Sequence, residues 1–283
     1  FALAPGWMVT AVVVGVVVGV VAGLYPAWRA ARVAPIDAPR DGLHMVDAYR
    51  CMLGDENRFQ NCTESALYWE NSRDCALLNN DFTGNPEAAV ELQNCWNCEL
   101  RNNRITGTGT EGISTGIYAA STRPPGGTVN PTEITGNRIS ETMIALELRP
   151  GNGAAFTDEE RLHEVVDDNV FSNNLNGLRA QGGDAVLSLW VRNNQFTDTV
   201  ETALSVDYYD AVDIADNQFT GNGQAMALED ITALPASPVS DNLVRDDGSP
   251  AVTIASCNLA WSDNTLIGDV GTAIEVSGTA DPS

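Results

Sequence analysis

The chain has 283 residues, with 38 acidic residues against 15 arginines and no lysine, which gives a formal net charge of −23. All 38 acids and 13 of the arginines lie in residues 37–283, so this part alone carries 13 − 38 = −25. This charge argues against nucleic acid as a partner, because phosphate binding needs basic patches, and against docking of this region on anionic lipid. An acidic, lysine-free surface is typical of halophilic proteins, although arginine in place of lysine also follows from genomic base composition.

The first element that the sequence predicts is a transmembrane helix. Residues 7–24 read WMVTAVVVGVVVGVVAGL, which is 18 residues without a charge, and a helix needs about 20 to span a bilayer. A buried strand or a signal peptide is the alternative, but a signal peptide has its basic residues before the apolar run, whereas here they follow it. Three glycines at intervals of four form a smooth stripe that would face membrane lipid or another transmembrane helix: Gly15, Gly19 and Gly23.

The segment after the predicted helix carries a resemblance to a transporter family. Residues 23–42 read GLYPAWRAARVAPIDAPRDG, and residues 3–42 as a whole resemble the C-terminal transmembrane end of FtsX-like ABC transporter permeases, the MacB class. The matching positions are Pro26, Ala27, Ala30, Ala31, Pro35 and Ile36. The resemblance implies an ABC assembly as a partner. The chain has no lysine and therefore no nucleotide-binding P-loop of its own, so we treat residues 1–42 as a membrane segment with a permease-like tail.

From residue 43 to residue 283 the sequence predicts one repetitive domain. The motif Asn-x-(Phe/Ile/Val/Leu) recurs nine times, and six of the eight spacings lie within 22–25 residues. Apolar residues alternate with polar ones on both sides of each asparagine, which indicates short strands with one face inward. We therefore predict an all-β fold, a right-handed parallel β-helix of about nine rungs, preceded by the single transmembrane helix. The repeated asparagines are expected to stack as a structural ladder: Asn57, Asn80, Asn103, Asn137, Asn169, Asn194, Asn217, Asn242 and Asn264.

The repeats over residues 50–280 resemble those of NosD-like right-handed β-helix proteins and of polysaccharide-processing β-helix proteins. The resemblance implies the fold and says little about activity. NosD-like proteins are associated with copper-site assembly, which implies a copper role for a group of soft ligands before the first rung: His44, Met45, Cys51 and Met52. The alternative is an apolar cap over the end of the solenoid. The sequence indicates no other metal site and no cofactor.

Catalytic residues are not evident in the sequence. The strings Gly-His-Gly, Arg-x-Lys and Asp-Pro-His-Asp, which mark families of β-helix polysaccharide enzymes, do not occur. The acid pairs Asp167-Asp168 and Asp246-Asp247 have the residue types for acid–base work, but in so acidic a chain such pairs are expected by chance, and the sequence favours solvated turns at both places. The sequence therefore favours a protein that is not an enzyme.

Two long spacings between ladder asparagines indicate inserts, roughly residues 121–130 and 150–163. Both follow the second strand of consecutive rungs, so they should project side by side from one edge of the rod. Their polar residues are the candidate ligand-binding groups: Arg123, Arg149, Asp158, Glu159, Glu160, Arg161 and His163. The alternative for residues 155–166 is a short helix capped by Thr157.

Six cysteines are too few for a disulfide scaffold. Cys75 and Cys98 each precede a ladder asparagine by five residues, so they should stack inward on adjacent rungs, where a disulfide and two small buried side chains are both possible. Cys95 and Cys98 have CxxC spacing, but on a strand two such thiols would lie on opposite faces, which argues against a zinc or redox site.

Three functions stay open. The leading hypothesis is a membrane-anchored, non-catalytic β-helix that binds a glycan or a protein and is linked to an ABC assembly. The alternatives are a lyase or hydrolase acting on acidic glycans, and a fragmentary fusion of a permease end to an unrelated β-helix. The sequence predicts a single-pass membrane protein. It leaves open on which side of the membrane the β-helix lies. Arg29, Arg32 and Arg40 after the helix favour the cytoplasm, whereas the fold type and the sequon at Asn61 favour the opposite side.

Overall fold

The computed structural model describes residues 42–107, 114–121, 132–150, 162–182, 187–232, 236–268 and 271–278. Every regular element within these ranges is a β-strand. These ranges therefore contain no helix that is long and apolar enough to cross a bilayer. The predicted transmembrane helix at residues 7–24, with Gly15, Gly19 and Gly23, lies outside the described residues, as does nearly all of the permease-like tail.

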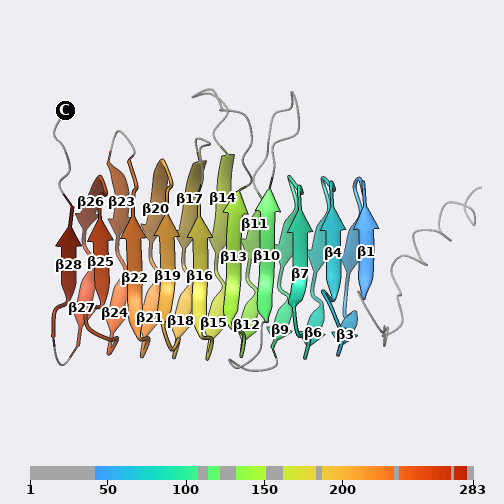
Figure 1. Cartoon of the computed structure of the whole chain (residues 1–283), viewed down its shortest axis with the longest axis horizontal. Coiled ribbons are helices and arrows are strands. Elements are labelled where there is room, and N and C mark those ends of the chain that lie inside the picture. Colours follow the sequence, from blue (N-terminus) through green and yellow to red (C-terminus); the bar gives the residue numbers. More distant parts are fainter. Residues whose placement is uncertain are drawn as a thin grey trace, which may run out of the picture.

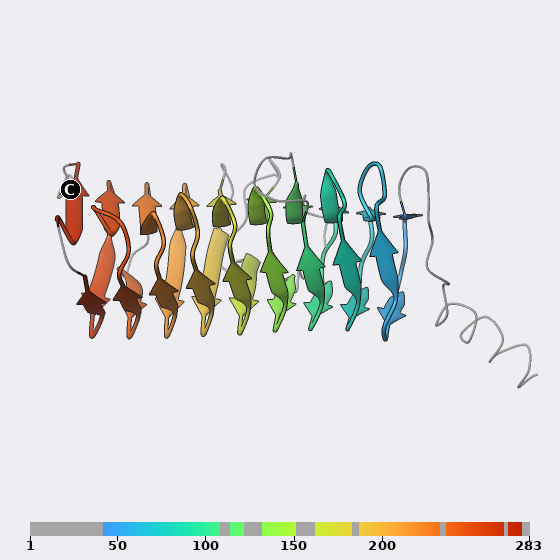
Figure 2. The same cartoon turned by 90° about the horizontal axis from the view of Figure 1, so that it is seen from below.

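The chain winds through three parallel sheets, and each turn adds one strand to each sheet. Figure 1 shows the resulting rod with β1 at one end and β28 at the other, and Figure 2 shows the successive turns side by side along it. This arrangement is a parallel β-helix, which confirms the β-helix part of the predicted fold.

The ten-stranded sheet contains β1 (Leu43–Val46), β4 (Leu67–Glu70), β7 (Ala88–Gln93), β10 (Thr115–Ser121), β13 (Ile144–Pro150), β16 (Asn176–Gln181), β19 (Thr202–Asp207), β22 (Gln224–Glu229), β25 (Val252–Ala255) and β28 (Ile274–Ser277). One nine-stranded sheet contains β2 (Met52–Gly54), β5 (Ala76–Leu78), β8 (Glu99–Arg101), β11 (Glu133–Thr135), β14 (Leu162–Asp167), β17 (Leu187–Arg192), β20 (Ala211–Ala215), β23 (Ser237–Ser240) and β26 (Leu259–Ser262). The other contains β3 (Arg58–Gln60), β6 (Asp81–Thr83), β9 (Arg104–Thr106), β12 (Arg138–Ser140), β15 (Val170–Ser172), β18 (Gln195–Thr197), β21 (Gln218–Thr220), β24 (Leu243–Arg245) and β27 (Thr265–Ile267).

The core fills the inside of the rod with the apolar residues that alternate along the strands. The residue two positions after each ladder asparagine points inward, as predicted, and where it is phenylalanine the rings stack between turns. Phe196 lies parallel to Phe219, with ring centroids 4.9 Å apart, and Phe171 stacks on its other side at 4.8 Å. The side-chain stack therefore repeats the strand spacing of about 4.8 Å.

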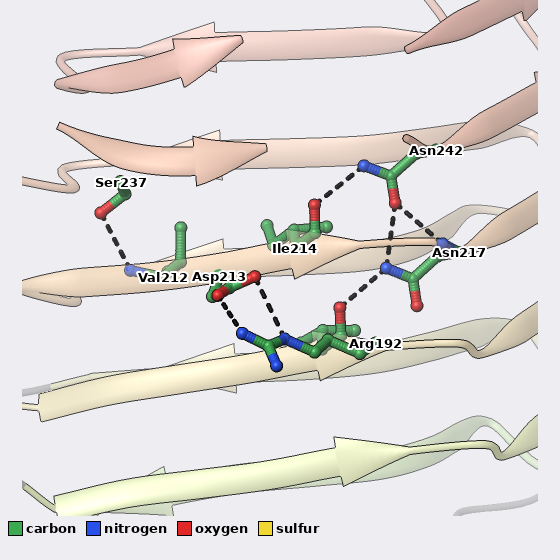
Figure 3. A network of polar contacts seen from close by, with 8 residues as sticks. Arg192, Val212, Asp213, Ile214, Asn217, Ser237 and Asn242 are labelled. Carbon is green, nitrogen blue, oxygen red and sulfur yellow. Dashed lines mark hydrogen bonds and ion pairs between the residues drawn. The ribbon is translucent and has the colours of Figure 1, made fainter. Parts of the chain in front are cut away.

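The nine repeated asparagines form a continuous hydrogen-bonded row. The backbone N–H and the side-chain Nδ2 of Asn194 both donate to Oδ1 of Asn217, at 2.9 and 3.0 Å. Asn217 in turn donates to Asn242 in the same way, and its Nδ2 also reaches the carbonyl of Val191 at 2.8 Å (Figure 3). Each asparagine thereby satisfies backbone groups of two turns, which a buried corner requires.

The sharp corner that holds this row has a local cause. The residue before every ladder asparagine has a positive φ, a conformation in which asparagine, aspartate and glycine cost least. These residues are Glu56, Asn79, Asn102, Gly136, Asp168, Asn193, Asp216, Asp241 and Asp263. The first aspartate pair is thereby explained, because Asp167 ends β14 and Asp168 makes the turn.

A second ladder lies five residues after the first. The side-chain Oδ1 atoms of Asn85, Asn174 and Asn222 each accept the backbone N–H of the equivalent residue one turn earlier, at 3.0–3.2 Å. Asp247 takes the same place next to Asn222, and burial, as the main cause, raises the pKa of its carboxyl to about 6. The second acid pair therefore contains a half-buried structural group, which differs from the expected solvated turn.

The strand β14 corrects one alternative from the sequence. Residues 155–166 do not form a helix as a whole, because Leu162–Asp167 is a strand that pairs in parallel with β11 and β17. Glu164 and Val166 alternate with outward residues and both point inward, as in a β-strand. This pattern, and not the capping signal at Thr157, determines the structure of residues 162–167. Glu164 is a buried carboxyl that the sequence did not point to, and its Oε2 accepts the hydroxyl proton of Tyr209 at 2.8 Å.

The stability of the rod should depend on pH through Glu164. Burial raises the pKa of this carboxyl from 4.5 to about 7, and the hydrogen bond from Tyr209 only partly opposes the shift. Because the folded-state pKa is the higher one, the contribution of Glu164 to the free energy of unfolding is fully present below pH 4.5. This contribution is lost as the pH rises through about 7. The whole loss should be about 3 kcal/mol, measured as the free energy of unfolding in urea at pH 4.5 and pH 8.5.

The variant Glu164→Gln should remove most of this dependence, because the amide carries no charge to be desolvated and can still bond to Tyr209. Glu133→Gln is the control, since Glu133 is exposed on β11. Wild-type and Glu164→Gln profiles that run parallel between these two pH values would contradict the assignment.

Candidate functional site

A row of alternating tyrosines and glutamates lies on the outer face of the ten-stranded sheet. Between the inward pairs of four consecutive strands stand Tyr68 on β4, Glu91 on β7, Tyr118 on β10 and Glu147 on β13. These four residues, called the Tyr–Glu row below, are direct neighbours in the parallel register. Their backbones are therefore about 4.8 Å apart from strand to strand.

Glu147 is the most enclosed member of the row, with 6% of its surface exposed although it faces outward. Arg149, two residues further on the same strand, donates to Glu147 Oε1 from Nε at 2.8 Å and from Nη2 at 2.7 Å. The guanidinium thus fixes the orientation of the carboxylate and is itself half exposed. A guanidinium carries five N–H donors, and this contact uses two of them.

Glu91 is oriented by two neighbours of its own. Ser65 Oγ donates to its Oε2 at 2.7 Å, and Gln93 Nε2 donates to its Oε1 at 3.0 Å. Between the two carboxylates, burial and the charges of Glu91 and Glu147 raise the pKa of Tyr118, while Arg149 opposes the shift. The Tyr118 phenol therefore stays neutral at ordinary pH and can donate or accept a hydrogen bond.

The two ends of the row carry basic or aromatic side chains. At the β1 end the ring of His44 meets Tyr68 edge to face, with centroids 4.6 Å apart. At the β16 end Arg179 is the register neighbour of Glu147 and is exposed. The row is therefore a polar strip with flat rings, fixed carboxylates and a cation within four or five strands.

The structure places one predicted binding residue, Arg149, beside this row. Strands β10 and β13 pair in register as far as Ser121 and Pro150, so the chain leaves both strands at the same edge. His163 belongs to β14, and its side chain is outside the described part. The other predicted residues lie outside the described ranges as well: Arg123, Asp158, Glu159, Glu160 and Arg161.

Sequence reasoning missed the row itself, although a signal was present. In four consecutive repeats, the residue between the inward pair of the second strand reads Tyr, Glu, Tyr, Glu. The pattern becomes visible only when the repeats are aligned on these strands rather than on the asparagines, because the spacing between the two varies.

The predicted soft-ligand group is not gathered in the structure. His44 lies on the outer face against Tyr68, whereas Met45 points inward, where its sulfur accepts the Trp69 Nε1 proton at 3.0 Å. Met52 is 64% exposed, and the thiol of Cys51 donates to the Tyr49 carbonyl at 3.8 Å. Across the described ranges, no three His, Cys, Asp or Glu side chains are grouped so that they could hold a metal ion.

The prediction that the two thiols of the CxxC motif lie on opposite faces is wrong. Cys95 and Cys98 do not point to opposite faces, since both are buried in the core. The motif lies at a corner rather than on a strand, and the positive φ of Asn94 and Asn97 turns both thiols inward. Cys75 is buried on the adjacent turn, and all six cysteines of the chain are in the free form.

Fold and surface together define a parallel β-helix protein with a polar outer strip. Two family models match the chain: one described as periplasmic copper-binding protein (NosD) over residues 34–179, and one described as right handed beta helix region over residues 125–283. Each covers more than half of the 283 residues, so the chain belongs to the NosD family and its β-helix is right-handed. The search of curated proteins and the search of solved structures gave no match.

The family match supports the NosD-like resemblance, and its description of periplasmic proteins favours an extracytoplasmic location. It gives no support to the permease resemblance of residues 3–42, which stays a prediction. Copper is named in the family description, but the described side chains do not fit it. The thiols of Cys75 and Cys98 donate to backbone carbonyls and have raised pKa values, which disfavours the thiolate that binds a metal, and His44 lies on the outer face.

Proposed function

We propose that this chain is an extracytoplasmic, non-catalytic binding module that holds a neutral saccharide along the Tyr–Glu row. The observation that carries the proposal is the alternation of tyrosine and oriented carboxylate over four neighbouring strands, with Glu147 enclosed and bonded to Arg149.

The chemistry of the row suits sugar rings. Aromatic rings offer a flat apolar face together with a polar edge. Carboxylates and a guanidinium that are already oriented form strong hydrogen bonds with hydroxyl groups at a small entropic cost. Tyr68 and Tyr118 are two strand spacings apart, about 10 Å, so one extended oligosaccharide could contact both rings.

The charge of the protein decides which saccharides are suitable. With −23 overall and two glutamates in the row, the surface repels polyanions. A polyuronate substrate is therefore disfavoured, and a neutral or amino sugar is favoured. The predicted inserts after β10 and β13, with Arg123, Asp158, Glu159 and Arg161, remain candidates for further ligand contacts on the basis of the sequence alone.

Anchoring is a separate part of the proposal and rests on the sequence alone. The apolar segment at residues 7–24 would hold the module on the membrane, and the permease-like tail suggests an ABC assembly as its neighbour. An extracytoplasmic β-helix conflicts with the charge rule applied to Arg29, Arg32 and Arg40. A protease-protection experiment on sealed membrane vesicles decides between the two orientations.

The binding proposal is tested with a saccharide array and two variants. Wild-type protein should be retained by neutral or amino oligosaccharides and not by polyuronates. Tyr118→Ala should weaken this binding at least tenfold, about 1.4 kcal/mol, because it removes the central ring. Glu147→Gln should weaken it similarly, because it breaks the ion pair with Arg149.

The matched controls are Trp190→Ala, an exposed aromatic residue on β17, and Glu133→Gln on β11. Both should bind like wild type. Equal affinity of Tyr118→Ala and wild type would rule out the row as the site. Release of reducing ends from the retained saccharide would instead favour the alternative that the protein is a hydrolase.

A further inference from the structure

Four cysteines gather in the first turns of the rod. Cys51, Cys75 and Cys98 directly precede β2, β5 and β8, and the register places them one above another on three successive turns. The amide of Ala76 donates to the Cys51 carbonyl at 2.8 Å, and the amide of Glu99 donates to the Cys75 carbonyl at 2.9 Å. Successive Cα atoms in such a column are about 4.8 Å apart.

The fourth cysteine joins this column from the same corner. Cys95 lies three residues before Cys98, and its thiol is turned inward next to that of Cys98. Sulfur contacts join Cys51 to Cys75, Cys75 to Cys98 and Cys98 to Cys95, and Cys95 also interacts electrostatically with Cys75. The other two cysteines belong to other places: Cys62 follows β3, and Cys257 precedes β26.

The pKa values of Cys75 and Cys98 are raised, which favours the neutral thiol over the thiolate that binds metals. The contact with Cys98, followed by burial, raises the pKa of Cys75. The pKa of Cys98 is about 12, because the contact with Cys75, which lowers it, is outweighed by the contact with Cys95 and by burial. The hydrogen bond from Cys98 lowers the pKa of Cys95, which makes Cys95 the first of the buried pair to become a thiolate.

We propose that these four cysteines form two disulfide bonds, Cys51–Cys75 and Cys95–Cys98, when the protein folds in an oxidising compartment. Because Cys75 is the cysteine neighbour of Cys51, this is the pairing of neighbours that leaves no thiol over, whereas a Cys75–Cys98 bond would leave Cys51 without a bonding partner. Strand spacing puts Cys51 and Cys75 within the Cα range of natural disulfides, 4.4–6.8 Å. The inference rests on the extracytoplasmic location and is independent of saccharide binding.

Each bond forms by exchange with a disulfide donor. One cysteine attacks a donor sulfur as its thiolate, which gives a mixed disulfide and releases one donor thiol. The second cysteine loses its proton and attacks the protein sulfur, which closes the bond and releases the second donor thiol. Two protein thiols are thus oxidised, and one donor disulfide is reduced to two thiols. Both steps take place before the core closes over Cys75, Cys95 and Cys98.

The test is disulfide mapping of the full chain. The protein is unfolded, reduced and refolded with oxidised and reduced glutathione, and free thiols are blocked with iodoacetamide before peptide mass spectrometry. We expect only Cys62 and Cys257 to be blocked, and the peptides of Cys51 and Cys75 to be joined. Six blocked thiols, or a Cys75–Cys98 bond with Cys51 and Cys95 blocked, would overturn the proposal.

A pair of variants checks the assignment independently. Cys75→Ser should leave Cys51 blocked and the Cys95–Cys98 bond intact, whereas Cys62→Ser, the matched control, should keep both bonds. The melting temperature of oxidised wild type should fall when a reductant is added, and the fall should be smaller in Cys75→Ser. An equal fall in both proteins would show that the Cys51–Cys75 bond is not present.

Discussion

Replacing Phe196 with alanine is expected to lower the free energy of unfolding by about 3–5 kcal/mol. Phe196 has no exposed surface and is stacked between the rings of Phe171 and Phe219. The strands on both sides are held in register by their ladders, so the core cannot collapse to fill the space. The loss therefore includes both the transfer energy of the ring and the cost of the cavity.

Urea unfolding at a fixed pH and salt concentration gives this value directly. Val200→Ala is the control, because Val200 is 62% exposed and its truncation should change stability by less than about 0.5 kcal/mol. A loss below about 1 kcal/mol for Phe196→Ala would mean that the interior is not packed as a continuous stack.

The variant Asn217→Ala is expected to cost about 1–3 kcal/mol. It removes the acceptor for two donors of Asn194 and the donor to the Val191 carbonyl, and all of these groups are buried. The alanine also leaves Oδ1 of Asn242 without the side-chain donor that it has in the wild type. Gln218→Ala, one residue further and exposed, is the matched control.

The Asn217→Ala variant tests whether the asparagine ladder contributes to the stability of the fold. If the ladder holds the corner, Asn217→Ala should lower the urea midpoint while Gln218→Ala leaves it unchanged. Equal midpoints for the two variants would show that the backbone ladders alone determine the corner. Neither variant should affect saccharide binding, because Asn217 lies away from the ten-stranded sheet.

Much of this fold could be predicted because each turn repeats the same short sequence pattern, and each position of the pattern has a physical role. The asparagine marks the corner, and the apolar alternation marks which face of each strand is buried, so the stack that contains Phe196 could be derived from spacing alone. The second ladder was equally accessible, since Asn85, Asn174 and Asn222 each follow a first-ladder asparagine by five residues.

The outer face was harder to predict, because outward residues are under no packing constraint that gives them a period. Glu91 and Glu147 look like ordinary surface acids until the register brings them to either side of Tyr118. The CxxC prediction failed for a different reason, because it assumed a strand at a place where the chain turns. The buried pair of Glu164 and Tyr209 is 45 residues apart in the chain, and no local pattern relates the two.

A crystal structure of the protein soaked with a retained oligosaccharide would show directly whether the outer face of the ten-stranded sheet binds a neutral saccharide. We expect sugar density along the Tyr–Glu row, with one ring against Tyr118 and hydroxyl groups bonded to Glu91, Glu147 or Arg149. Sugar density on either nine-stranded sheet, with the row empty, would contradict it.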